Sequence, residues 1–323
     1  MPGIAHPPFP NDIPTHPLLV VDYALIKAGD VQEIEKLWKA ATELGFWYYK
    51  AAGRNATDEY GSQDTVEFLN VSKDDALAYP EVIHRTYPST VRARMESTIK
   101  PFVRKSLEVN NTVLSVFEKK LGLPAGVLLK YHALEEPSGS EARCIKNPPK
   151  RSVITAAQAA QEKERVALGA HTDFGSLSFL HNRLGGLQVL PPGSDDWQYV
   201  RPLPGHAICN VGDALTLFSG GILRSNLHRV VPPPGAQSAY ARWSLVFFTR
   251  PGDNIHLHAL AEESKAVKEV VERMTVEERK RFEPNATAKE WFARRVKNQR
   301  INNRTGPETW RASRGMEHKP EVI

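Results

Sequence analysis

The spacing of apolar residues predicts helices in the first part of the chain. Between residues 31 and 44 they recur every three or four positions, which predicts an amphipathic helix that Asp30 can cap. Residues 62–69 and 81–121 also favour helix. We expect a kink or a break at Pro101, because proline removes a backbone donor from the helix interior.

Shorter apolar runs without helical spacing predict strands at 18–23, 46–49 and 128–134. From Ala167 to Arg250 such runs alternate with turns rich in glycine and proline, which is typical of a β-sandwich or barrel. Within this region we expect a hairpin of 186–190 with 197–200, and buried strands at 207–211 and 243–249.

These patterns divide the 323 residues into three regions of one integrated unit. Residues 1–125 form a helical and strand-containing region, 126–260 a β-rich core, and 261–323 a helical tail, where Trp291 and Phe292 are candidate packing anchors. An insertion at 147–166, rich in proline, alanine, glutamine and charge, directly precedes the first candidate site and is predicted to be a surface loop or to border that site.

Composition is that of an ordinary globular protein, with 41% hydrophobic and 24% charged residues. The net charge of +5 is mild and comes without a basic reader motif, so no nucleic-acid partner is expected. Cys144 and Cys209 form neither a Cys-x-x-Cys pair nor a zinc-finger spacing. With no secretory pattern and no apolar run of about 18 residues, we expect a cytoplasmic protein without a membrane partner.

The first chemical constellation is His171-Thr172-Asp173 together with His228, 55 residues further on. In a strand, residues two apart share a face, so His171 and Asp173 would point an imidazole and a carboxylate at one place. Two histidines and one carboxylate make the facial triad of non-haem Fe(II) oxygen chemistry. Zinc could use the same ligand types.

The second constellation is Arg242-Trp243-Ser244, which begins 14 residues after His228. On a strand, Arg242 and Ser244 share a face, and a guanidinium with a hydroxyl grips a carboxylate through parallel hydrogen bonds. The implied ligand is a small dicarboxylate that chelates the metal at one end and meets Arg242 at the other.

Together these residues resemble the iron(II)- and 2-oxoglutarate-dependent dioxygenase superfamily, in particular its isopenicillin N synthase-like branch and the fungal oxygenases of specialised metabolism. The likeness is strongest from His171 to Ser244 and includes the stretches 210–215 and 227–230. It also covers the segments 17–22 and 44–47 near the start. The resemblance implies a mainly β fold with flanking helices, the double-stranded β-helix or jelly roll.

The resemblance assigns His171, Asp173 and His228 as catalytic iron ligands, and Arg242 with Ser244 as the pair that holds the distal carboxylate of 2-oxoglutarate. Tyr131 falls where relatives place a tyrosine near this co-substrate, although the surrounding residues differ from the family pattern. Fe(II), 2-oxoglutarate and O₂ are the implied cofactors. The implied reaction oxidises a C–H bond of a small metabolite, for example a polyketide-derived aromatic, by hydroxylation or a related step.

Two other functions fit the same residues. An oxidase like isopenicillin N synthase would not use 2-oxoglutarate, and its Arg-x-Ser pair would hold a substrate carboxylate instead. A jelly roll could also bind the metal without catalysis. Release of succinate separates the first alternative from a dioxygenase, and oxygen uptake with iron and 2-oxoglutarate separates the second.

Overall fold

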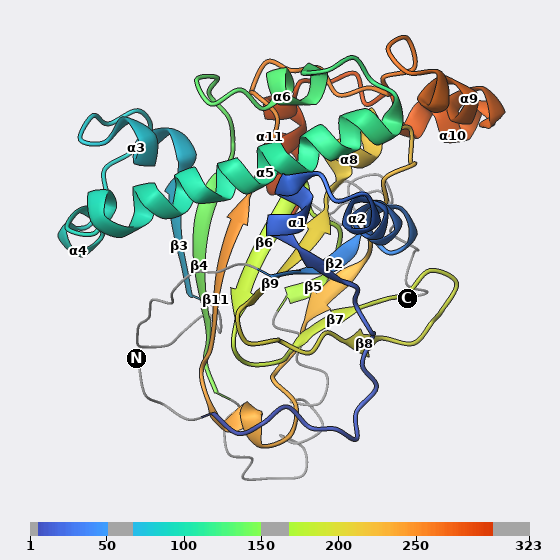
Figure 1. Cartoon of the computed structure of the whole chain (residues 1–323). Helices are drawn as coiled ribbons and strands as arrows, with labels where there is room; N and C mark the ends of the chain where they lie inside the picture. Colours follow the sequence, from blue (N-terminus) through green and yellow to red (C-terminus); the bar gives the residue numbers. More distant parts are fainter. Residues whose placement is uncertain (1–5, 51–66, 150–167, 300–323) are drawn as a thin grey trace.

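The strands form two sheets in this computed structural model, which describes residues 6–50, 67–149 and 168–299. The larger sheet contains, in spatial order, β1 (Val20–Asp22), β2 (Phe46–Lys50), β9 (His206–Val211), β6 (Leu177–Asn182), β11 (Arg242–Phe248), β4 (Glu141–Asn147) and β3 (Glu67–Ser72). The smaller sheet contains β5 (Leu168–His171), β10 (His228–Val230), β7 (Leu187–Val189) and β8 (Gln198–Tyr199). Apart from the parallel pair β1–β2, neighbours are antiparallel, and the fold is the predicted jelly roll (Figure 1).

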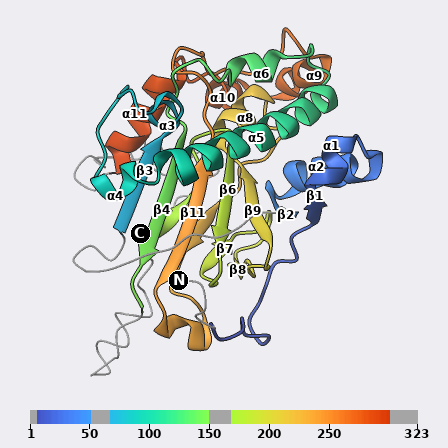
Figure 2. The same cartoon turned by 60° about the vertical axis from the view of Figure 1, so that its left-hand side comes forward.

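The described residues also form helices between and after the strands. They are α1 (Tyr23–Ala28), α2 (Val31–Glu43), α3 (Lys73–Ala78), α4 (Ser89–Arg92), the π-helix η1 (Met95–Ile99), α5 (Lys100–Leu121), α6 (Val127–Tyr131), α8 (Asp213–Phe218), the 3-10 helix η2 (Gly235–Ala239), α9 (Lys265–Arg273), α10 (Val276–Arg281) and α11 (Ala288–Gln299). Figures 1 and 2 show the long helix α5 crossing the strands near their upper ends. Its ring contacts, Phe117 with Trp47 and Phe102 with Phe247, attach it to β2 and β11.

Side chains alternate between the two faces of each strand, so the larger sheet separates two hydrophobic cores. On β6, Leu177 and Phe179 belong to the large core beneath the helices, so Ser178 between them faces the smaller sheet. A second, smaller core lies between the sheets, where Phe46 and Ile208 of the larger sheet pack with Val189 of the smaller one. The inner faces of both sheets therefore enclose the space in which the predicted site residues can meet.

Several predicted elements are confirmed. Helix α2 begins after Asp30, whose side chain accepts a hydrogen bond from the Glu33 amide at 2.8 Å. Gly45 follows it with φ +77°, and a Cβ there would lie 1.9 Å from the Arg224 carbonyl oxygen. The hairpin β7–β8 and the strands β9 and β11 also form as expected. Pro101 lies at the start of α5, where the π-helix gives way to regular α-helix.

Two predicted elements are wrong. The run 128–134, expected as a strand, begins as helix α6, because the buried Glu118 carboxylate accepts hydrogen bonds from the amides of Gly126, Leu128 and Leu129 and so satisfies its free N–H groups. The stretch 62–69, expected as helix, contains the start of β3, which is held by pairing with β4; residues 62–66 lie outside the described part.

Three further expectations concern the tail, the insertion and membranes. The described part of the tail, up to residue 299, contains the helices α9, α10 and α11, as predicted, and residues 300–323 lie outside the described part. Most of the 147–166 insertion also lies outside the described residues. Among the helices that the structure describes, none combines the length and the apolar character that crossing a bilayer requires. The predicted cytoplasmic location stays a prediction.

The buried His132, directly after α6, should make the stability of the folded protein depend on pH. Burial lowers its pKa from 6.5 to about 4, because the interior disfavours the charged ring. Between these two values the unfolded chain binds a proton that the folded chain does not, so stability falls as the pH drops. The full effect is about 3 kcal/mol. We expect chemical denaturation of the metal-free protein at a series of pH values to show this slope, and the variant His132→Gln to lose most of it. An equal slope in both proteins would contradict the assignment.

Candidate metal centre and co-substrate site

The three predicted metal ligands come together at one end of the smaller sheet. His171 ends β5, His228 begins β10, and the two residues are direct register partners. Asp173 Oδ1 lies 3.8 Å from His171 Nε2 and 3.6 Å from His228 Nε2, a spacing that one ion could bridge. Asp173 follows the end of the strand, so the turn after β5, rather than strand alternation, brings its carboxylate to the imidazoles.

The second oxygen of the Asp173 carboxylate is held by the larger sheet. Oδ2 accepts hydrogen bonds from Ser178 Oγ at 2.5 Å and from Asn210 Nδ2 at 2.7 Å. Burial alone raises the pKa of Asp173, but the two histidines and these hydrogen bonds outweigh it and lower the pKa below its usual value. The carboxylate is therefore ionised and oriented before any ligand binds. Sequence reasoning assigned no role to Ser178 or Asn210.

The ring of His228 is oriented for metal binding through Nε2. Its Nδ1–H donates to the Asn226 carbonyl oxygen at 3.1 Å, which leaves the lone pair of Nε2 facing Asp173. The edge of the ring meets Phe46 at 5.3 Å between centroids. Two neighbours thus restrain the imidazole.

The loop that carries Asp173 packs tightly on the end of β9. The Asp213 amide donates to the Asp173 carbonyl oxygen at 2.8 Å. A Cβ at Gly212 would lie 2.3 Å from the Gly175 carbonyl oxygen, so only glycine allows this approach. The stretch 210–213 therefore supports the ligand loop with both its side chains and its backbone.

Arg242 and Ser244 lie on the inner face of β11. Phe247 packs in the outer core, so the even-numbered residues of this strand face the smaller sheet. Arg242 Nε donates to the Gly185 carbonyl oxygen at 2.7 Å, and Nη1 donates to Ser244 Oγ at 2.6 Å. Because Ser244 lies two residues further along β11, the guanidinium points toward the end of the strand where Phe248 pairs with Ser178.

One nitrogen of the Arg242 guanidinium makes no hydrogen bond to the described residues. Arg242 is 2% exposed, and its Nη2 has no hydrogen-bond partner among the described residues. Burial lowers its pKa to about 10, which leaves the guanidinium protonated at neutral pH. A buried cation with an open donor favours an anionic ligand, and a carboxylate fits the fork of a guanidinium.

The structure separates Tyr131 from this arginine. Tyr131, at the end of α6, packs on Phe218 at 5.3 Å between ring centroids, and burial raises its pKa, with a further contribution from Glu263. Helix α6 lies at the upper end of the molecule and the start of β11 at the lower end (Figure 1). Asn147 is the buried register partner of Arg242. The role of Tyr131 at the co-substrate stays a prediction.

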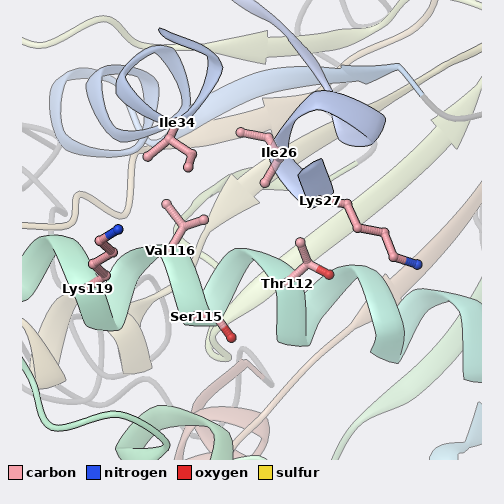
Figure 3. A pocket seen from close by; sticks show the side chains of 7 residues that line it. All are labelled: Ile26, Lys27, Ile34, Thr112, Ser115, Val116 and Lys119. Carbon is pink, nitrogen blue, oxygen red and sulfur yellow. The ribbon is translucent and has the colours of Figure 1, made fainter. Parts of the chain in front are cut away.

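Two other buried or half-buried histidines and two phenylalanines near the site strands pack in structural surroundings. His132 hydrogen-bonds the Leu128 carbonyl oxygen and Ser176, and His181 packs on Phe102 in the outer layer. Phe179 and Phe218 belong to the large core. A surface hollow of about 310 Å³ is lined by side chains of α1, α2 and α5 (Figure 3), and neither the triad nor Arg242 contributes to it.

Comparison with known proteins agrees with this geometry. Residues 149–251 match the family model of the 2OG-Fe(II) oxygenase superfamily. The chain contains a domain of this superfamily. That 2OG-Fe(II) oxygenase domain includes all three candidate ligands and the Arg242–Ser244 pair.

The chain is also similar to fungal proteins and, in fold, to a solved structure. A 2-oxoglutarate-dependent dioxygenase of Aspergillus fumigatus is 34% identical over 175 residues, which cover 49% of this chain and 44% of that protein, so the match spans less than half of the relative. The 2-oxoglutarate-dependent dioxygenase frbH of a Dothideomycetidae species is 26% identical over 286 residues, 78% of this chain and 87% of that one. The crystal structure of a full-length Neurospora crassa protein in complex with alpha-KG has a TM-score of 0.62 at 20% identity and covers 81% of this chain and 91% of that one.

We predict that metal binding depends on Asp173 and on its hydrogen-bond donors to different degrees. Asp173→Ala removes the carboxylate between the imidazoles and should abolish Co(II) or anaerobic Fe(II) binding in a calorimetric titration. Asn210→Ala leaves the ligands in place and should weaken binding by about 10- to 100-fold. Circular dichroism of the metal-free variants controls for folding. Full affinity in a folded Asp173→Ala protein would exclude this metal site.

We predict that Arg242 determines the requirement for 2-oxoglutarate. Arg242→Ala should raise the KM for 2-oxoglutarate by at least about 30-fold, because a buried ion pair loses one partner. In the unaltered protein, 2-oxopentanoate, which has the same chain length without the distal carboxylate, should fail to replace 2-oxoglutarate at the same concentration. Steady-state CO₂ release measures both the KM of Arg242→Ala and the use of 2-oxopentanoate, which would yield butyrate instead of succinate. Unchanged kinetics in Arg242→Ala would contradict the role.

Proposed function

We propose that this protein is a non-haem Fe(II)- and 2-oxoglutarate-dependent dioxygenase that oxidises a C–H bond of a small specialised metabolite. The observation that carries the proposal is the open Nη2 of Arg242, a buried cationic donor on the inner face of the larger sheet, which faces the smaller sheet that carries His171 and His228. A metal ion at the cluster and a carboxylate at Arg242 would each compensate a charge that the fold has buried.

His171, Asp173 and His228 would hold the iron, whose donor set of two imidazoles and one carboxylate suits Fe(II). Arg242 and Ser244 would hold the distal carboxylate of 2-oxoglutarate. When bound, iron and 2-oxoglutarate supply the oxidising chemistry, in which O₂ is consumed, 2-oxoglutarate becomes succinate and CO₂, and a substrate C–H bond is oxidised. The chain itself contributes ligand orientation, charge and exclusion of water.

The hydrogen bonds around Asp173 and His228 support this role for the protein. Ser178 and Asn210 fix one carboxylate oxygen and leave the other for the metal, while Asn226 fixes the His228 tautomer. A site held in this way needs little rearrangement when the metal binds.

The names of the relatives support the reaction class, and their fungal origin supports a specialised metabolite as substrate. We propose a small metabolite such as a polyketide-derived aromatic, by analogy with fungal relatives. Membership of the isopenicillin N synthase-like branch stays a prediction.

The test is succinate formation by the purified protein with Fe(II), ascorbate, 2-oxoglutarate and O₂. We expect slow uncoupled turnover without substrate, stimulated when a library of small aromatic metabolites contains the substrate. Asp173→Ala should show neither the uncoupled turnover nor the substrate-stimulated turnover. Oxygen uptake that needs iron but not 2-oxoglutarate would instead favour an oxidase of the isopenicillin N synthase type. Metal binding without oxygen uptake, with or without substrate candidates, would favour a non-catalytic jelly roll.

A further inference from the structure

The tail helix α11 places a buried arginine beside the metal-ligand loop. Arg295 is 1% exposed, its Nη1 lies 2.8 Å from Asp213 Oδ2, and its Nη2 donates to the Thr172 carbonyl oxygen at 3.2 Å. The guanidinium also lies over the ring of Phe174, 4.4 Å from its centroid. Arg295 thus touches the residues on both sides of Asp173.

Asp213 connects Arg295 to Thr172 and to the backbone of Asp173. Its Oδ2 also accepts the Thr172 hydroxyl at 3.0 Å, and its backbone amide donates to the Asp173 carbonyl oxygen at 2.8 Å. Thr172 and Asp213 are both fully buried. The peptide groups that precede and follow Asp173 are therefore tied to one buried ion pair.

Helix α11 is itself fixed to the rest of the protein. Thr287 and Glu290 cap its start with reciprocal hydrogen bonds. The amides of Ala288 and Lys289 donate to the carbonyl oxygens of Ile255 and Asp253, in the segment after β11. The helix can therefore deliver Arg295 to the loop at a defined position.

We infer that Arg295, acting through Asp213 and Thr172, is a positioning residue that holds Asp173 in the geometry needed to bind the metal. This inference rests on the proposed function. The two parallel donors of a guanidinium can meet a carboxylate and a carbonyl oxygen together, whereas the single ammonium of lysine cannot keep both contacts in this geometry. The effect is expected at the metal and not at the distal carboxylate of 2-oxoglutarate, because Arg242 is held separately by Gly185 and Ser244.

The experiment measures Co(II) affinity and the Co(II) d–d absorption spectrum in Arg295→Lys, Arg295→Met and Thr172→Val. We expect affinity to fall by about 10- to 100-fold, as for other residues that orient metal ligands, with an altered spectrum. At saturating metal, the affinity for 2-oxoglutarate should stay unchanged. Arg294→Ala is the matched control, since Arg294 is the exposed neighbour on the same helix, and it should leave all readouts unchanged.

Amide hydrogen exchange of residues 170–175 in the metal-free protein gives a readout that needs no metal. We expect faster exchange there in Arg295→Lys and Thr172→Val than in Arg294→Ala, with the β9–β6 pairing still protected. If Arg295→Met does not fold, the lysine and valine variants decide. Folded variants with unchanged loop exchange, metal affinity and spectrum would overturn the inference. If the unaltered protein bound no metal, the proposed function would fail, while the exchange comparison would still test whether Arg295 orders the loop.

Discussion

Burying charge inside a protein is costly unless a partner compensates it, and this jelly roll buries the charges of Asp173 and Arg242 around the space between its sheets. Asp173 directs one oxygen at two histidines and gives the other to Ser178 and Asn210. Arg242 keeps two donors in protein contacts and leaves a third without a partner among the described residues. The two sheets, the inner core and the tight turns around Gly212 serve to hold these two charges in fixed orientations.

The candidate site could be predicted from sequence because its chemistry is carried by rare combinations of residue types. His171, Asp173 and His228 could be recognised as a triad although the reason given for their convergence was incomplete, since Asp173 lies beyond the strand. The spacing of Arg242 and Ser244 was a stronger physical argument, because both lie within β11 and share its inner face. The alternation of short apolar runs with turns rich in glycine and proline from 167 to 250 was equally informative, since this pattern is typical of a sandwich or barrel.

The failures arise where contacts distant in sequence decide the outcome. An apolar run such as 128–134 is compatible with helix or strand, and the Glu118 carboxylate, about ten residues earlier, stabilises the helix. The pairing of Asn147 with Arg242 could not be foreseen, because it depends on strand register. Arg295 lies in a charged helix that resembles any solvated tail, and only the folded chain reveals that its side chain points inward.

The separation of 82 residues between Asp213 and Arg295 has a consequence for biosynthesis. Ribosomes make the chain from the N-terminus, so all three ligands and both sheets are translated before the helix that neutralises Asp213. Until that helix docks, a nascent jelly roll would contain a buried carboxylate without its cation, and the turn bearing Asp173 would lack one of its supports. Completion of the candidate metal site would then wait until α11, the last helix that the structure describes, has left the ribosome and docked.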